Sequence, residues 1–183
     1  MQHIETAAII SPIVLPLVMG GTLVLRKGRR GDVRQIVTQG IKVAATVFFA
    51  GCVFNLGLKV LLGTFVPGWK MIWRPSLCPQ AQKRGDHSCE QCGMWPRYGG
   101  ALGGRASLGM PSGHAQLCGL VLGLALTMGY DIRASVILLL LSVLILMQRV
   151  DSGCHTNAQV WTGWLVGLCL TPLVARFIIK WCL

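Results

Sequence analysis

Hydrophobic residues gather along the chain in five runs that are separated by polar stretches. The first and last runs, residues 6–25 and 156–175, carry no charged residue and match the ~20 residues that a membrane-spanning helix needs. Three shorter runs lie between them, at residues 43–58, 115–130 and 134–148. The pattern therefore predicts an all-α, polytopic membrane bundle of about five transmembrane helices, with a long loop between the second and the third.

Pairs of glycines with three residues between them occur in two of these runs. Gly119 is paired in this way with Gly123, and Gly163 with Gly167. This spacing of small residues lets two helices approach closely within a lipid environment. We therefore expect these glycines to lie at helix contacts.

The composition agrees with a membrane protein, because 53% of the residues are hydrophobic and only 13% are charged. Soluble domains carry about 25% charged residues. The chain length fits one domain over residues 1–183. The formal net charge of +11 comes from bases scattered between the apolar runs. This scatter argues against nucleic acid and favours membrane lipids or a phosphate substrate as partners.

Basic residues follow the first run directly, in the segment "RKGRRGDVR" at residues 26–34. The positive-inside rule places this loop in the cytoplasm. The front of the first run, "MQHIET", has no basic stretch, which favours a retained span over a signal peptide. With five spans, the loop over residues 63–111 and the short segment around His155 then share the lumenal or external face.

Three polar clusters come to that face. They are "WRP" at residues 73–75, "PSGH" at residues 111–114 and "QRVDSGCHTNAQ" at residues 148–159. Together they hold histidines, arginines, hydroxyls and glycine backbone, without paired carboxylates. Guanidinium groups bind phosphate oxygens in a bidentate way. One imidazole can attack phosphorus while another protonates the departing oxygen, so the set predicts phosphoryl chemistry.

The order of these clusters resembles the type 2 phosphatidic acid phosphatase superfamily, whose members are metal-independent membrane phosphatases. Residues 111–114 match the second family motif letter for letter, and Arg149 and His155 keep the five-residue gap of the third. The string "HTNAQVWTGWLVG" is similar to the polyprenyl-diphosphate branch, dolichyldiphosphatase in particular. The resemblance implies a lipid phosphatase that hydrolyses a polyprenyl (dolichyl-type) diphosphate at the lumenal face of the endoplasmic reticulum membrane.

The resemblance also implies a role for each site residue, and it implies no metal and no organic cofactor. His155 attacks phosphorus and forms a phosphohistidine, while His114 gives a proton to the leaving group. Gln159 orients His155. The remaining residues bind phosphate oxygens: Lys59, Arg74, Ser112, Gly113 and Arg149.

Gln159 departs from the family pattern, which usually has an aspartate four residues after the histidine. If Thr156 begins a helix, His155 and Gln159 lie one turn apart on the same face. The amide oxygen can then accept the imidazole N–H. Asp151, four residues before His155, is a competing candidate for the orienting group.

The first motif departs as well, because the family expects a lysine six residues ahead of Arg-Pro. Lys59 is fifteen positions before Arg74 and Lys70 only four. We prefer Lys59, because "NLGLK" has an Asn-x3-Lys form seen in dolichyldiphosphatase-like members. Lys70 stays open as the phosphate lysine, and a lysine that only extends towards the interface is the alternative for Lys59.

Other functions stay open at this point. A loop cluster could form disulfides or bind zinc: Cys78, His87, Cys89 and Cys92. Ser112 and His155 could form an intramembrane serine protease dyad, although a protease gives no reason for Arg74 and Arg149. A lipid-binding protein of the same fold without activity is the third reading. The sequence leaves the exact lipid and the oligomeric state undecided.

Overall fold

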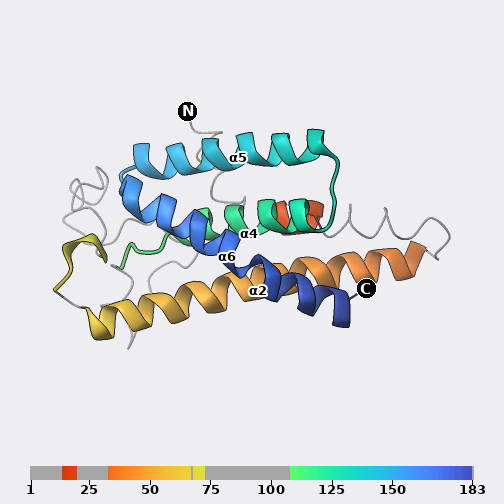
Figure 1. The fold of residues 1–183 in the computed structure, drawn as a ribbon, viewed down its shortest axis with the longest axis horizontal. Helices are drawn as coiled ribbons and strands as arrows, with labels where there is room; N and C mark the ends of the chain where they lie inside the picture. The colour runs from red at the N-terminus through yellow and green to blue at the C-terminus, as the bar shows by residue number, and fades with distance from the viewer. Residues whose placement is uncertain (1–13, 20–32, 67, 73–107, 183) are drawn as a thin grey trace.

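The computed structural model describes residues 14–19, 33–66, 68–72 and 108–182, and these residues form helices joined by short connections (Figure 1). Residues 14–19 form a short helical segment. The remaining helices are α2 (Val33–Phe65), the 3-10 helix η1 (Lys70–Ile72), α4 (Gly113–Thr127), α5 (Ile132–Asp151) and α6 (Asn157–Trp181).

Three of the described helices are long and apolar enough to cross a membrane. They are residues 37–65 of α2, the whole of α5 and the whole of α6. Helix α4 is apolar but has only 15 residues. The described part of the chain therefore confirms an all-helical fold with apolar helices at the predicted places. The first predicted run lies largely outside the described residues, so the count of five spans stays a prediction.

Helix α2 is longer than its apolar run. It begins at Val33 and ends at Phe65, whereas the run covers residues 43–58. Glutamine, lysine and arginine are good helix formers, and Gln39 and Lys42 occupy the extra turns at its start. Long polar side chains at a helix end can reach the membrane interface. The apolar run therefore identifies the middle of the helix and not its ends.

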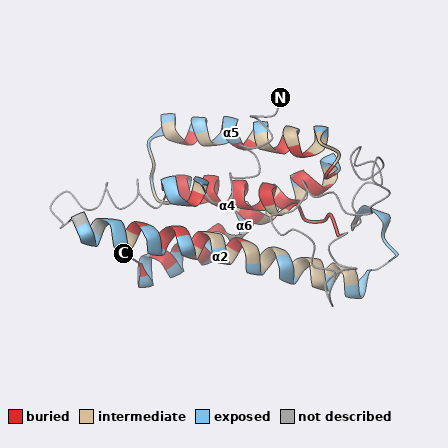
Figure 2. Ribbon diagram, turned by 180° about the vertical axis from the view of Figure 1, so that it is seen from behind, coloured by how far each residue is buried: buried red, intermediate tan, exposed pale blue. Residues whose placement is uncertain are grey.

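Helix α4 lies at the centre of the bundle. Every residue from 114 to 125 is buried, and α4 packs against α2, α5 and α6 (Figure 2). The core between them contains Val47 of α2, Leu120 of α4 and Ile178 of α6. In contrast, α5 leaves large apolar side chains such as Leu144 exposed. A helix that is apolar all round belongs inside, and the exposed leucines of α5 suit contact with lipid.

Glycines allow α4 and α6 to touch through their backbones. A Cβ atom at Gly119 would overlap the carbonyl oxygen of Trp164, and one at Gly167 would overlap that of Gln116. At Gly163 a Cβ would lie 2.5 Å from the carbonyl oxygen of Ser112. These contacts confirm the expected packing role of the paired glycines. They also fix the start of α4 against the start of α6.

The two ends of the bundle differ in composition. The start of α2, the turn between α4 and α5 and the end of α6 lie together at one end (Figure 1). Basic residues occur in these segments, namely Arg34, Arg133, Arg176 and Lys180. The end of α2, η1, the start of α4 and the α5–α6 connection lie at the other end. That other end holds Lys59, Lys70 and Arg149 together with the candidate motifs, so the two ends differ in their polar motifs and not in the presence of basic residues.

Substitution of Gly167 tests the backbone contact. We expect Gly167→Ala to destabilise the fold by about 1–3 kcal/mol, because the added methyl group has to push apart two helices in backbone contact. Gly57 is the matched control, since a Cβ there meets nothing within 4 Å. Gly57→Ala should be neutral or stabilising by up to ~1 kcal/mol. Thermal unfolding of both variants in detergent provides the measurement, and equal stability of the two would contradict the contact.

Candidate active site

Three segments that are far apart in the sequence meet at the end of the bundle opposite the start of α2. The backbone N–H of Ser112 donates to the carbonyl of Gln159 at 3.2 Å, which joins the start of α4 to α6. The side-chain amide of Gln159 donates to the carbonyl of Met71 at 2.8 Å, which joins α6 to η1. The start of α4, the first turn of α6 and η1 are thus connected through hydrogen bonds.

The start of α4 presents Ser112 and Gly113 at a helix N-terminus. Ser112 is the N-cap residue and has an extended backbone, but its side chain makes no capping bond. The side chain is fully buried, and its Oγ has no hydrogen-bond partner among the described residues. Buried hydroxyls are normally satisfied. A helix N-terminus also favours an anion, so this hydroxyl is suited to meet an oxygen of a bound phosphate.

The α5–α6 connection brings Arg149 and His155 together. Helix α5 ends at Asp151, and Gly153 then adopts a φ of 69°, a left-handed conformation that glycine adopts without strain. The chain turns back so that the N–H of His155 donates to the carbonyl of Arg149 at 3.2 Å. His155 is buried, and so is His114 at the start of α4.

Helix α6 begins as the sequence predicts, and its first turn orients His155. Thr156 is the N-cap residue and forms a capping box with Gln159. The Oε1 atom of Gln159 lies 3.2 Å from the Thr156 N–H and 3.3 Å from Nδ1 of His155. A carbonyl oxygen only accepts hydrogen bonds. Nδ1 of His155 is therefore the donor of this hydrogen bond, which favours the tautomer with the proton at Nδ1.

Arg149 brings a positive charge into this buried end. Its side chain is 1% exposed and is the largest fully buried side chain of the described residues. Asp151 is exposed to solvent, although it follows Arg149 by only two residues. A buried charge is favourable only where opposite charge or hydrogen-bond acceptors meet it, and the oxygens of a phosphoryl group provide both.

Asn55 connects α2 to the start of α4. Its amide nitrogen lies 3.1 Å from the carbonyl of Pro111 and 2.9 Å from Oε1 of Gln116. Lys59 follows one turn later on α2 and is half-buried, so these bonds hold its helix next to Ser112. Gln116 is fully buried in α4.

The other candidate residues are less close to this cluster or are not described. Lys70 is exposed in η1. Arg74 lies outside the described residues, as do the loop residues Cys78, His87, Cys89 and Cys92. The assignment of Arg74 to phosphate binding and the choice between disulfides and zinc therefore stay predictions.

Sequence reasoning missed two features of this end. Cys154, directly before His155, is buried and disulfide-bonded, whereas the other cysteines of the described residues are free, namely Cys52, Cys118, Cys169 and Cys182. Its position between Gly153 and a candidate nucleophile was the available signal. The second feature is Gly109, where a Cβ would lie 2.5–2.7 Å from the side-chain amide atoms of Gln159.

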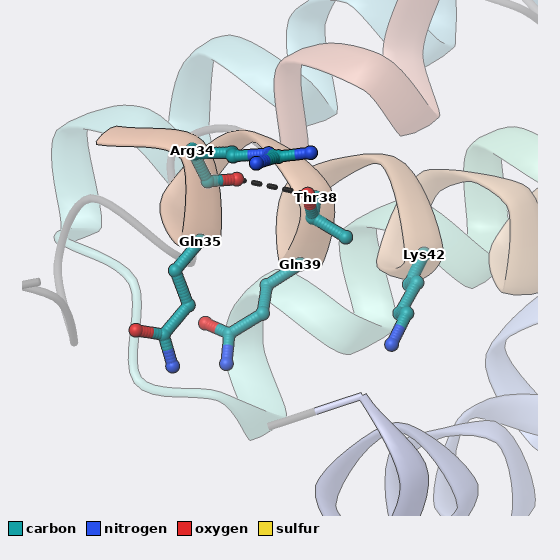
Figure 3. Close-up of a pocket in the computed structure, with 5 residues that line it drawn as sticks. All are labelled: Arg34, Gln35, Thr38, Gln39 and Lys42. Atoms are coloured by element: carbon teal, nitrogen blue, oxygen red, sulfur yellow. Dashed lines mark hydrogen bonds between the residues drawn. The ribbon is translucent and has the colours of Figure 1, made fainter. Parts of the chain in front are cut away.

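A cavity of about 370 Å³ lies elsewhere, at the start of α2 (Figure 3). It is lined by one polar face of this helix: Arg34, Gln35, Thr38, Gln39 and Lys42. Thr38 Oγ1 donates to the carbonyl of Arg34 at 2.8 Å. None of the candidate catalytic residues lines this cavity, so the cluster at the opposite end remains the candidate active site.

Comparison with known proteins gives one family. Residues 39–181, most of the chain, match the model of the PAP2 superfamily. The matched region begins within α2 and contains both candidate histidines. No curated protein and no solved structure matches the chain significantly.

The bond between Asn55 and Gln116 can be tested by a double-mutant cycle. Each of Asn55→Leu and Gln116→Leu should destabilise the protein by about 1–3 kcal/mol, because each leaves a partly or fully buried polar partner unsatisfied. The double variant should lose less than the sum, because both partners are then removed together. Thermal unfolding of the four proteins measures the coupling, and strictly additive losses would show that the two side chains do not interact.

Proposed function

Because the chain belongs to the PAP2 superfamily, whose members are phosphatases, we propose that it hydrolyses a polyprenyl (dolichyl-type) diphosphate through a phosphohistidine intermediate. Membership of the family and the apolar helices make it an integral membrane phosphatase of lipid phosphates. The proposal of a phosphohistidine intermediate rests on the geometry around His155. Its Nδ1 faces the amide oxygen of Gln159 at 3.3 Å, so the tautomer with the proton at Nδ1 gives Nε2 the electron pair that attack on phosphorus needs.

In the first step, Nε2 of His155 attacks the terminal phosphorus of the lipid diphosphate. An N–P bond forms while the P–O bond to the lipid monophosphate breaks, and His114 gives its proton to the departing oxygen. The N–H at Nδ1 stays bonded to Gln159, so the positive charge that develops on the imidazole is held in place.

In the second step, water attacks the phosphohistidine. His114, now without its proton, accepts one from the water, so inorganic phosphate leaves and both imidazoles return to their starting states. The lipid monophosphate from the first step is the other product.

The start of α4 and three basic side chains supply positive charge around the phosphoryl group. Arg149 is buried at the end of α5, and we assign it, Lys59 and Arg74 to the oxygens of the phosphate. Guanidinium groups stabilise the charge that spreads over these oxygens in the transition state. The Gly113 N–H and the Ser112 hydroxyl add hydrogen bonds at the helix N-terminus.

The membrane location and the substrate class are supported by different observations. A disulfide at Cys154 indicates an oxidising compartment, which agrees with an active site on the lumenal or external face. The exposed leucines of α5 suit the long apolar tail of a polyprenyl substrate. We propose the endoplasmic reticulum membrane as the location.

The structure gives the alternatives less support. A serine protease needs its nucleophile within reach of a base, whereas the Ser112 Oγ has no hydrogen-bond partner among the described residues. A lipid-binding protein without activity would need no orienting bond at His155.

Replacement of the two histidines tests the reaction. His155→Ala should abolish phosphate release, and His114→Ala should reduce it by about 10²–10⁴-fold, the usual contribution of a general acid. Release of phosphate from a panel of lipid phosphates and diphosphates, in detergent with excess chelator, is the measurement. The polyprenyl diphosphate should be the preferred substrate.

Asp151→Asn is the control for this experiment, because Asp151 is exposed and should leave activity unchanged. An active His155→Ala protein, or strict dependence on a divalent ion, would refute the mechanism. If Asp151→Asn removes activity as well, the orienting role belongs to Asp151 and not to Gln159.

A further inference from the structure

One peptide group at the start of α4 is bonded on both sides by other helices. It is the group that joins Pro111 to Ser112. Its carbonyl oxygen accepts from the side-chain amide of Asn55 on α2 at 3.1 Å. Its N–H donates to the backbone carbonyl of Gln159 on α6 at 3.2 Å. Because a peptide group is planar, these two bonds together fix the direction in which the backbone enters α4.

Asn55 also contacts the first turns of α4 directly. Its Nδ2 atom donates to Oε1 of Gln116 at 2.9 Å as well as to Pro111. A carbonyl oxygen only accepts hydrogen bonds, so the bond to Pro111 requires Nδ2 in this position, and both of its hydrogens are then used. The amide oxygen lies against Gly113, where an added Cβ atom would be 3.2 Å from it.

These contacts control the entry angle of α4. In many helices an apolar residue before the N-cap packs on the fourth helical residue, and this contact fixes how the chain enters the helix. Pro111 and Gln116 occupy these two positions in α4, and the amide of Asn55 bridges them with hydrogen bonds. Asparagine is a poor helix former, so the bonds to α4 offset the cost of placing it within α2.

We propose that Asn55 is a positioning residue that holds the first turn of α4 in the direction needed to bind phosphate oxygens. This inference rests on the proposed phosphatase function, in which the Gly113 N–H and the Ser112 hydroxyl bind these oxygens. The side chain of Ser112 makes no capping bond to this turn, so α2 holds the turn from outside. Because both amide hydrogens of Asn55 are used within the protein, it acts through the turn and not on the substrate.

Two variants separate this role from a general loss of stability. Asn55→Leu removes the bonds to Pro111 and Gln116. Gln116→Leu removes the bond between the two side chains and a long one, at 3.5 Å, to the carbonyl of Gly51, but it leaves Asn55 able to donate to Pro111. Both variants should lose stability, because each leaves a polar partner unsatisfied. Gln116→Leu is therefore the matched control.

Inorganic phosphate is the probe for binding. A ligand that binds only the folded protein raises its Tm, so thermal unfolding in detergent at increasing phosphate concentrations gives a dissociation constant without turnover. Asn55→Leu should weaken phosphate binding at least about tenfold, as expected for the loss of a hydrogen bond to a charged group. It should raise KM for a polyprenyl diphosphate by a similar factor. Gln116→Leu should keep both values within about threefold of the parent.

Equal phosphate affinity in Asn55→Leu and Gln116→Leu would overturn the inference, because binding would then not depend on the bond to Pro111. A parent protein that phosphate does not stabilise would also overturn it. If Asn55→Leu does not fold, Asn55→Ala decides by the same comparison, since it lacks the donor and adds no bulk beside Gly113. A parent protein that phosphate stabilises but that releases phosphate from no lipid would refute the proposed function alone, and the binding comparison would still test Asn55.

Discussion

The backbone contact between α4 and α6 is the constraint on which the rest of the structure depends. At Gly163 and Gly167 the helix α6 has no side chain, so the carbonyl groups of Ser112 and Gln116 lie directly against it. Gly163 follows Gln159 by one helical turn. The contact therefore sets the distance between the Pro-Ser-Gly-His segment and the His155–Gln159 pair before any polar bond is made.

Side-chain amides make several of the hydrogen bonds at this end of the bundle. The side chain of Gln159 makes hydrogen bonds with Thr156, His155 and Met71. The side chain of Asn55 donates to Pro111 and Gln116. A hydrogen-bond network of this kind becomes rigid when each of its polar groups has a partner.

The hydroxyl of Ser112 is buried at this end, and no described residue bonds to it. A rigid frame around a buried hydroxyl of this kind suits a site that is completed by its substrate. Burying polar residues in membrane helices costs free energy, and such residues usually have a function.

The sequence predicts the helices well, because they depend on local patterns. Apolar runs identify α2, α5 and α6, and Thr156 is recognisable as a helix start. The extension of α2 back to Val33 is not predictable from hydropathy, because polar turns can continue a helix beyond its apolar run.

Contacts between residues far apart in the chain could not be predicted from the sequence. The bond of Gln159 to Met71 joins residues 88 positions apart, and it involves a backbone carbonyl that has no signal of its own in the amino-acid letters. The same holds for the packing of Gly109 on that amide. The disulfide of Cys154 depends on which other cysteine approaches it in space, and the spacing of the cysteines does not determine that partner.

Trapping of the intermediate tests the central claim most directly. Purified protein is mixed with a polyprenyl diphosphate that carries a radioactive terminal phosphorus, quenched in base during turnover and digested for peptide mapping. The account predicts label on the peptide that contains His155, stable in base and lost in acid, as expected of a phosphoryl group on imidazole nitrogen. Label on Ser112, or turnover without any labelled peptide, would contradict it.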